Sequence, residues 1–179
     1  MSLKIPLGNS GELVILTDTV LEHFQRHQQQ RKRDTEAGGQ LFGRIQGTTI
    51  TIEEATGPRR SDIRSRYSYI PDRKTEQREI NERFPSGLHF IGDWHTHPEP
   101  IPHPSRTDLD NMRECVKKSR RAVSGFLLII VGTAPLPGGL HASLHNGIDT
   151  LVLHMADEHL PTEDQAGDRA EGSRFEVRE

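Results

Sequence analysis

The chain has 179 residues, of which 32% are hydrophobic and 27% charged, with a formal net charge of −3. This length suits one domain with an adequate core, and the single cysteine, Cys115, excludes disulfides within the chain and cysteine-rich zinc frameworks. The longest apolar run, residues 126–131, is far too short to cross a bilayer of about 30 Å, so we expect a cytoplasmic protein.

The first half of the chain predicts short strands interrupted by two helices. A strand at residues 12–17 leads into a helix capped by Asp18, with Val20, Leu21 and Phe24 on its buried side. A hairpin with its turn at residues 46–48 follows. The expected elements after the first helix are strands 40–45 and 49–54, a candidate strand at 66–70, and a polar helix opened by Pro71 and Asp72 that runs to Phe84.

The second half predicts mainly strands, with one further helix. That helix spans residues 105–118 and places Leu109, Met112 and Val116 on one side. The strands expected here are 88–95, 125–131, 140–146 and 150–156. The succession indicates an α+β fold, and we expect one domain over residues 1–156.

The end of the chain differs in charge from the rest. Residues 157–179 contain eight acids and three bases, a net charge of −5, whereas residues 1–156 carry +2. The tail also has few apolar residues, so it cannot bury enough surface to offset the entropy lost on ordering. We therefore expect most of this acidic tail to be disordered.

Basic residues gather in three places, at residues 31–33, 59–66 and 117–121. Such clusters can attract an acidic partner or a nucleic acid, and they can equally form solvated faces. The chain has only nine aromatic residues, and none is interleaved with these clusters in the way that single-stranded nucleic acid requires. We therefore do not expect nucleic-acid binding.

A histidine pair at the end of an expected strand is the strongest chemical signal. His95 and His97 are two residues apart, so both rings leave the same face of a strand. Pro98 ends the strand, and residues 98–104, with four prolines among seven, form a stiff connection to Ser105. Asp108 then lies in the first turn of a helix, where its carboxylate can point back towards the histidines.

Each part of this pattern also has an ordinary structural interpretation. Ser105 and Asp108 resemble a common helix N-terminus, and a single His-x-His occurs by chance on half-exposed strands. The combination favours a metal site, because it supplies three ligands suited to zinc and leaves a position for water. An open position is typical of catalytic rather than structural zinc.

A hydrolytic zinc site also needs an acid that takes a proton from the attacking water. Glu36 is the candidate, because it precedes the glycine pair Gly38-Gly39 and a strand, and glycine permits close backbone approach. A turn carrying a solvated acid is the alternative.

Three other polar residues lie near the histidine pair in the sequence. His103 is excluded as a ligand, because it sits between Pro102 and Pro104 in an extended segment. Asp93 and Glu99 could accept hydrogen bonds from the ligand histidines, although a solvated position is the simpler interpretation for both.

These residues together resemble the JAMM (JAB/MPN-plus) metalloprotease signature. The resemblance covers residues 10–155 and rests on Glu36, the run Gly-Gly-Gln-Leu-Phe-Gly at 38–43, Trp-His-Thr-His-Pro at 94–98, Pro-Ser at 104–105 and Asp108, with no position substituted. It implies a single JAB/MPN-type domain with a curved mixed sheet flanked by helices and a zinc site at a strand end and helix N-terminus. In such a site His95, His97 and Asp108 hold Zn2+, Glu36 is the general acid/base, and Ser105 steadies the oxyanion.

Within that family, residues 92–100 and 126–131 resemble the short bacterial JAB proteins encoded with anti-phage CBASS systems and integrative elements. Those proteins accompany an E1/E2-like ligase, which implies a peptidase that cuts after the C-terminal residue of a conjugated protein. The expected partner is a cGAS-like nucleotidyltransferase or a bacterial ubiquitin-like protein.

Two questions about function stay open from the sequence. Loops 57–69, expected to be mobile, and 133–139 are candidate substrate clamps, or else plain surface loops, and both are short for ubiquitin itself. A non-catalytic MPN-type or RadC-like interaction module is the alternative function. The chain contains no Gly-x-Ser-x-Gly, phosphate-binding loop or His-Glu-x-x-His motif that would indicate another enzyme class.

Overall fold

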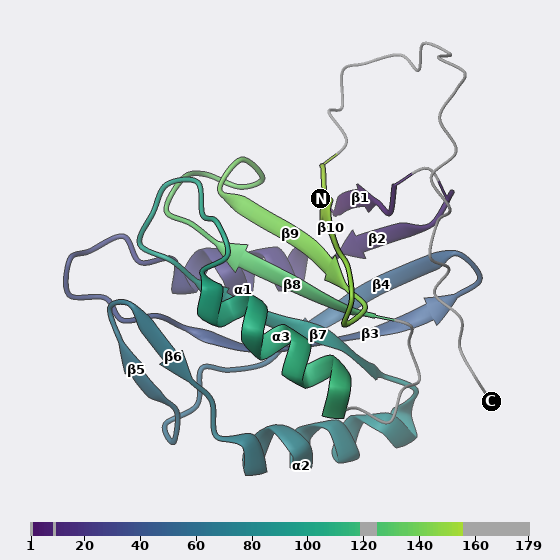
Figure 1. Cartoon of the computed structure of the whole chain (residues 1–179), viewed down its shortest axis with the longest axis horizontal. Helices are drawn as coiled ribbons and strands as arrows, with labels where there is room; N and C mark the ends of the chain where they lie inside the picture. The colour runs from purple at the N-terminus through teal and green to yellow at the C-terminus, as the bar shows by residue number, and fades with distance from the viewer. Residues whose placement is uncertain (1, 9, 119–124, 156–179) are drawn as a thin grey trace.

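The computed structural model describes residues 2–8, 10–118 and 125–155, and it is an α+β fold with one curved mixed sheet flanked by three helices (Figure 1). The eight strands of this sheet are hydrogen-bonded in the order β1-β2-β4-β3-β7-β8-β9-β10. Their bounds are β1 (Leu3–Pro6), β2 (Leu13–Leu16), β3 (Gly38–Gln46), β4 (Thr49–Ala55), β7 (His89–Thr96), β8 (Phe126–Val131), β9 (Leu140–His145) and β10 (Thr150–Leu153). Neighbours are antiparallel except for the parallel pairs β2–β4 and β7–β8.

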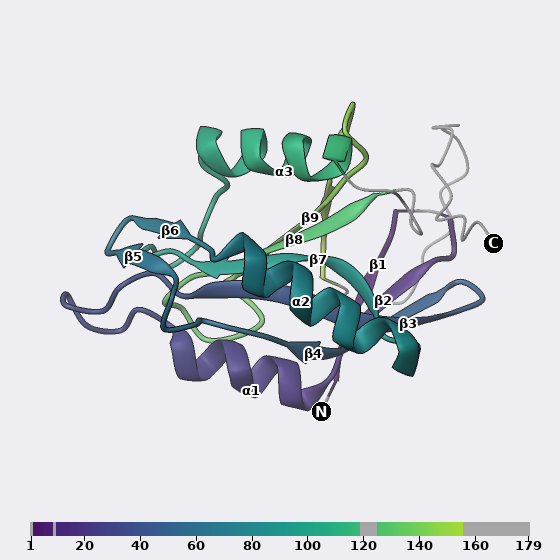
Figure 2. The same ribbon diagram turned by 90° about the horizontal axis from the view of Figure 1, so that it is seen from below.

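The helices lie on both sides of this sheet, as Figure 2 shows for α1 (Asp18–His27) and α3 (Arg106–Lys118). Val20 and Phe24 of α1 belong to the main core cluster. Met112 and Val116 of α3 form a second cluster with Phe126, Leu128 and Ile130 of β8. Side chains alternate between the faces of a strand, so these three residues of β8 lie on the face that α3 covers.

The third helix, α2 (Arg73–Arg83), begins where the sequence predicted. The Asp72 carboxylate accepts hydrogen bonds from the backbone N–H groups of Lys74 and Thr75 at 3.1 and 3.3 Å, which caps the helix. A 3-10 turn, η1 (Phe84–Ser86), follows, and Gly87 ends it with φ of 74°. The turn brings the chain back to the start of β7.

The predicted elements are mostly confirmed, with four differences. Asp18 does not cap α1, because it is already helical and Thr17 occupies the cap position. The predicted strand at 66–70 is confirmed as β6 (Ser68–Ile70), but part of the expected loop at 57–69 forms β5 (Ile63–Ser65), which pairs with β6 in a separate hairpin. The predicted strand at 150–156 ends at Leu153, and the sequence did not predict β1.

The described part of the chain ends soon after the last strand of the sheet. Leu153 in β10 is 5% exposed and belongs to the main core cluster, so the last strand of the sheet also packs into this core. The predicted domain end at residue 156 and the predicted acidic tail, residues 157–179, lie outside the described residues. No helix within the described ranges is both long and apolar enough to cross a bilayer.

Candidate active site

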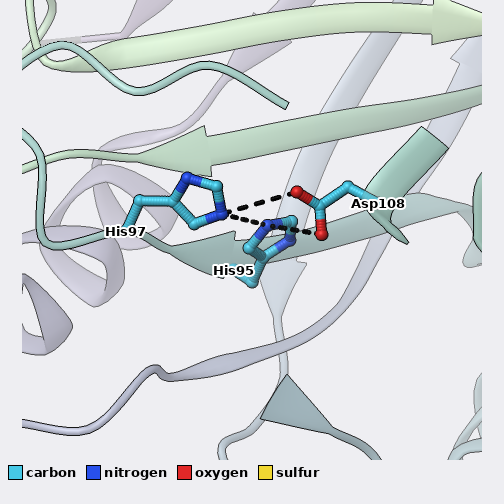
Figure 3. A group of neighbouring side chains, drawn as sticks. All are labelled: His95, His97 and Asp108. Carbon is cyan, nitrogen blue, oxygen red and sulfur yellow. Dashed lines mark hydrogen bonds and ion pairs between the residues drawn. The ribbon is translucent and has the colours of Figure 1, made fainter. Parts of the chain in front are cut away.

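Three side chains predicted to bind metal converge at the end of β7. His95 in β7 and His97, which follows the last residue of that strand, meet Asp108 from the first turn of α3 (Figure 3). One possible ligand atom from each lies within 4.8 Å of the others. The Nε2 atoms of the two histidines are 3.1 Å apart, and Asp108 oxygens lie 3.4 Å from His95 Nε2 and 3.5 Å from His97 Nε2.

These separations suit a tetrahedral metal ion. Ligand atoms about 2.0–2.2 Å from zinc in a tetrahedral site lie roughly 3.3–3.6 Å from one another, close to the distances found here. The donor set, two imidazoles and one carboxylate, is also one that catalytic zinc sites use, with a fourth position left for water. The residues therefore fit a metal ion, and both histidine side chains are largely buried.

Thr96, between the two histidines, fixes the strand from its opposite face. Its hydroxyl accepts a hydrogen bond from the Ala37 N–H at 2.9 Å and donates one to the Gln29 amide oxygen at 3.0 Å. The Thr96 N–H in turn donates to the Ala37 carbonyl at 2.8 Å. Because Ala37 follows Glu36 directly, the same contacts align the histidines and the predicted acid. The sequence analysis did not identify Thr96 as a supporting residue. The only indication was its position between the two histidines, which places its side chain on the opposite face of the strand.

Glu36 is buried and lines the same cavity as the three ligand candidates. The cavity has a volume of about 640 Å³, and Glu36 is 6% exposed. Burial, followed by the charges of Asp108 and Glu99, raises the pKa of Glu36 to about 7 against the opposing effect of His97. The alternative interpretation of Glu36 as a solvated acid in a turn is wrong, because this carboxyl group is enclosed.

Ser105 and Asp108 cap α3 reciprocally. The Ser105 N–H donates to the Asp108 carboxylate at 2.7 Å, and the Asp108 N–H donates to the Ser105 hydroxyl oxygen at 3.2 Å. The ordinary capping interpretation is therefore confirmed, and it also aims Asp108 at the histidines. Although burial opposes it, hydrogen bonds from His95 and His97 hold the pKa of Asp108 well below its usual range. Ser105 lines the cavity beside them.

The three neighbouring polar residues behave differently from one another. His103 is exposed and is not a member of the candidate metal group. Glu99 is also largely exposed, with an oxygen 3.9 Å from His97 Nδ1. The solvated interpretation is wrong for Asp93, whose Oδ1 is buried without a hydrogen-bond partner among the described residues. Burial and the charge of Glu76 raise the pKa of Asp93 to about 7.

A buried arginine beside the site was not found from the sequence. The Arg59 side chain is 9% exposed and donates to both carboxylate oxygens of Glu79 at 2.8 and 2.6 Å and to the Thr56 hydroxyl at 3.0 Å. It also donates to the Tyr69 hydroxyl at 3.4 Å, and the Tyr69 ring lies where a side chain on Gly38 would have to be. Arg59 thus anchors the hairpin of β5 and β6 beside Glu36. From the sequence, the basic cluster that contains Arg59 suggested a surface for an acidic partner or a solvated face.

The hairpin is also attached to Glu36 itself. The Glu36 N–H donates to the Ser65 carbonyl at 2.7 Å, and the Arg64 guanidinium donates to the Glu36 carbonyl at 3.3 Å. Both backbone groups of Glu36 are therefore held by β5. The loop at residues 57–69, predicted to be either a substrate clamp or a plain surface loop, in part supports the backbone of Glu36.

Known proteins resemble this chain in sequence and in fold. A family model described as prokaryotic homologs of the JAB domain matches residues 18–143. A "CD-NTase/cGAS isopeptidase" of Pseudomonas aeruginosa is 32% identical over 157 residues, covering 76% of this chain and 91% of the relative. A "probable metalloprotease" of Sinorhizobium fredii is 31% identical over 127 residues, covering 68% of this chain and 77% of the relative. The solution structure of a protein from Desulfitobacterium hafniense has a TM-score of 0.55 at 19% identity, covers 76% of this chain and 87% of that one, and shows the same fold.

Proposed function

The chain belongs to the prokaryotic JAB family of peptidases, and from this premise we propose that it is a zinc-dependent isopeptidase that removes a conjugated protein by cleaving after the C-terminal residue of that protein. The conjugated protein that we propose first is a cGAS-like nucleotidyltransferase, since relatives from several bacteria carry the name CD-NTase/cGAS isopeptidase. A bacterial ubiquitin-like protein is the second candidate. The reaction would reverse an E1/E2-like ligation in anti-phage defence, in the cytoplasm.

One observation carries this proposal: a buried acid, a hydroxyl and three convergent metal ligands line a single cavity. In the proposed assignment His95, His97 and Asp108 hold the zinc ion. Zinc in such a site lowers the pKa of water to about 7 and polarises the scissile carbonyl. Hydrolysis of an amide then requires a proton acceptor, a proton donor for the leaving amine, and stabilisation of the developing oxyanion.

The proposed roles of the remaining residues follow from their surroundings. Glu36, in its carboxylate form, accepts the proton of the attacking water and then gives it to the leaving amine, two tasks for which a pKa near neutrality is suited. The Ser105 hydroxyl oxygen already accepts the Asp108 N–H, so its own proton is available to donate to the oxyanion. The hydrogen bond that the Glu36 N–H donates to the Ser65 carbonyl and the one that its own carbonyl accepts from Arg64 keep the Glu36 backbone in place.

The test uses purified protein and a panel of C-terminal fusions. Ubiquitin-like proteins and cGAS-like nucleotidyltransferases are each joined through their last residue to a reporter protein, and release of the reporter is followed with and without a chelator. Metal-dependent release of one fusion supports the isopeptidase and identifies the substrate class. If no fusion is cleaved under any metal condition, a non-catalytic interaction module becomes the better explanation.

A further inference from the structure

Two of the basic clusters found in the sequence meet beside the candidate active site. Arg66, at the turn between β5 and β6, donates from its guanidinium group to the backbone carbonyls of Arg31 and Lys32 at 3.0 and 2.8 Å. The loop that contains residues 31–33 and the hairpin of β5 and β6 therefore lie side by side, although they are distant in the sequence. The fold joins the exposed part of both clusters into one basic surface.

A buried amide anchors this basic surface to the metal-site strand. Gln29 is 2% exposed, and its Nε2 donates to the backbone carbonyls of Asp34 and Arg66 at 3.2 and 2.9 Å. Its Oε1 accepts the hydroxyl proton of Thr96 at 3.0 Å, and Thr96 separates the two candidate histidine ligands. Gln29 thus ties the loop, the turn of the hairpin and β7 together, so the basic surface has a fixed position relative to the candidate active site.

The cations of this surface are not neutralised within the described part of the chain. Five of them form no ion pair with any described residue, namely Arg31, Lys32, Arg33, Arg64 and Arg66. All except Arg66 are exposed. The carboxylate of Asp34, the nearest acid in the loop, accepts the backbone N–H of Arg31 at 2.8 Å instead. Gathering like charges destabilises a folded protein by repulsion, so a cluster held by buried contacts indicates a surface that receives negative charge from another molecule.

The position of the surface indicates which molecule supplies that charge. Tyr67 is 74% exposed, lines the active-site cavity, and has its ring 5.6 Å from Cζ of Arg66, while Arg64 reaches the carbonyl of Glu36. The basic surface therefore continues to the mouth of the cavity, where the substrate enters. Tyrosine and arginine are enriched in protein interfaces, whereas single-stranded nucleic acid needs several rings for stacking and Tyr67 is the only exposed ring in the loop and hairpin. These features favour an acidic polypeptide.

We propose that the surface formed by Arg31, Lys32, Arg33, Arg64 and Arg66 docks an acidic segment of the protein substrate, separate from the substrate residues that enter the cavity. The proposal rests on the proposed isopeptidase function and adds a second point of attachment to it. Opposite charges on two exposed surfaces speed their association and select among partners. The surface therefore lowers KM for a substrate with a suitably placed acidic segment, and it leaves the chemical step to the residues of the cavity.

Binding of a short acidic peptide tests the surface without any cleavage. A labelled peptide of alternating Glu and Gly is titrated onto the full chain at low ionic strength, and fluorescence anisotropy is followed, with a Gln and Gly peptide as the neutral comparison. Lys32→Glu with Arg33→Glu changes the net charge by −4 at exposed side chains and should weaken the acidic peptide at least about tenfold. Lys4→Glu with Lys117→Glu makes the same change at exposed lysines outside the surface and should keep the wild-type affinity.

Three results of this titration overturn the surface. Equal weakening by the two double variants would mean that only the net charge matters. Equal affinity of wild type for the acidic and the neutral peptide would mean that no acidic segment is recognised. Tighter binding of a single-stranded oligonucleotide than of the acidic peptide, lost in Lys32→Glu with Arg33→Glu, would assign the surface to nucleic acid instead.

Cleavage kinetics separate failure of this proposal from failure of the proposed function. For a fusion that wild-type protein cleaves, Lys32→Glu with Arg33→Glu should raise KM at least about tenfold while kcat is retained. At about 1 M salt, where the screening length falls to about 3 Å, variant and wild type should have the same KM. An unchanged KM at low salt overturns docking of the substrate, although the isopeptidase function stands. If no fusion is cleaved, the proposed function fails, and the peptide titration still decides whether the surface binds an acidic segment.

Discussion

The fold alters the chemistry of Glu36, because enclosure raises its pKa to about 7 while its backbone is fixed by β5. We predict that Glu36→Gln retains metal and thermal stability but loses at least about 100-fold in kcat, the factor typical of general acid–base groups. Glu99→Gln, an exposed acid 3.9 Å from His97, is the matched control and should retain most activity. Fusion cleavage and elemental analysis measure both. Wild-type turnover by Glu36→Gln would remove this residue from the mechanism.

His97 lies at the centre of the ligand group, with its Nε2 close to both His95 and Asp108. Removing one of three protein ligands leaves too few donors for a tight zinc site, so we predict that His97→Ala purifies without stoichiometric metal. His103→Ala is the comparison, since His103 is a nearby exposed histidine outside the group and its loss should leave the metal content as in wild type. Equal zinc in His97→Ala and wild type, by elemental analysis, would refute the ligand assignment.

His145 is a buried histidine whose protonation makes the stability of the fold depend on pH. It is 2% exposed, its ring nitrogens are 2.9 Å from the Ser143 hydroxyl and 3.1 Å from the Thr150 hydroxyl, and burial with the charges of His141 and Arg113 lowers its pKa to about 4. The folded protein therefore holds His145 neutral, whereas the unfolded chain binds a proton below its ordinary pKa of 6.5. The stability that this group contributes is complete above about pH 6.5 and is lost as the pH falls towards 4.

Because folding lowers the pKa of His145, we predict that this residue makes the unfolding free energy of the wild type fall by up to about 3 kcal/mol between pH 6.5 and 4. His145→Gln removes the titrating group, so its unfolding free energy should fall less over the same range. Urea denaturation of both proteins at several pH values measures the difference. Parallel curves for the two proteins would show that His145 is not the group responsible.

At the scale of elements, the hairpin of β5 and β6 depends on Arg59. Replacing this guanidinium with an amide leaves the Glu79, Glu76 and Asp62 carboxylates without their shared cation, and breaking a buried pair by removing one partner costs about 3–5 kcal/mol. We predict that Arg59→Gln detaches the hairpin and increases hydrogen exchange at the Glu36 amide, which donates to Ser65 in β5. Arg60→Gln, an exposed neighbour, should leave that exchange rate as in wild type.

The sequence predicted those elements whose signals are local. Asp72 capping α2 and Ser105 before α3 are N-terminal signals within a few residues of the helices they start. The strands β1 and β5 have four and three residues, so neither is long enough to show alternation, and both form only because a partner strand lies beside them.

In the candidate site, too, the sequence predicted only the residues whose signals are local. His95, His97, Ser105 and Asp108 lie within 14 residues, and their pattern could be recognised directly. Thr96 acts through Ala37, 59 residues away. Such roles depend on strand pairing, which a single sequence does not specify.

For the whole molecule, the candidate metal centre joins the two layers of the fold. His95 belongs to the strand β7 and His97 follows its last residue, whereas Asp108 belongs to α3, which packs on the sheet through Met112 and Val116. A metal ion bound to all three would therefore connect a helix to the sheet as well as supply chemistry. Ligands that bind only the folded state stabilise it by mass action.

We predict that removing metal lowers the thermal stability of the whole chain. With free zinc at about 100 times its dissociation constant, binding contributes about 2.7 kcal/mol. For a chain of this size that corresponds to a rise in Tm of roughly 5–10 °C. Calorimetry of the wild type with EDTA and after zinc is restored measures this shift. His97→Ala should melt at the same temperature under both conditions, because its ligand set is incomplete. If wild type and His97→Ala respond equally to EDTA, the stabilising ion is bound elsewhere, and the connection between α3 and β7 does not depend on it.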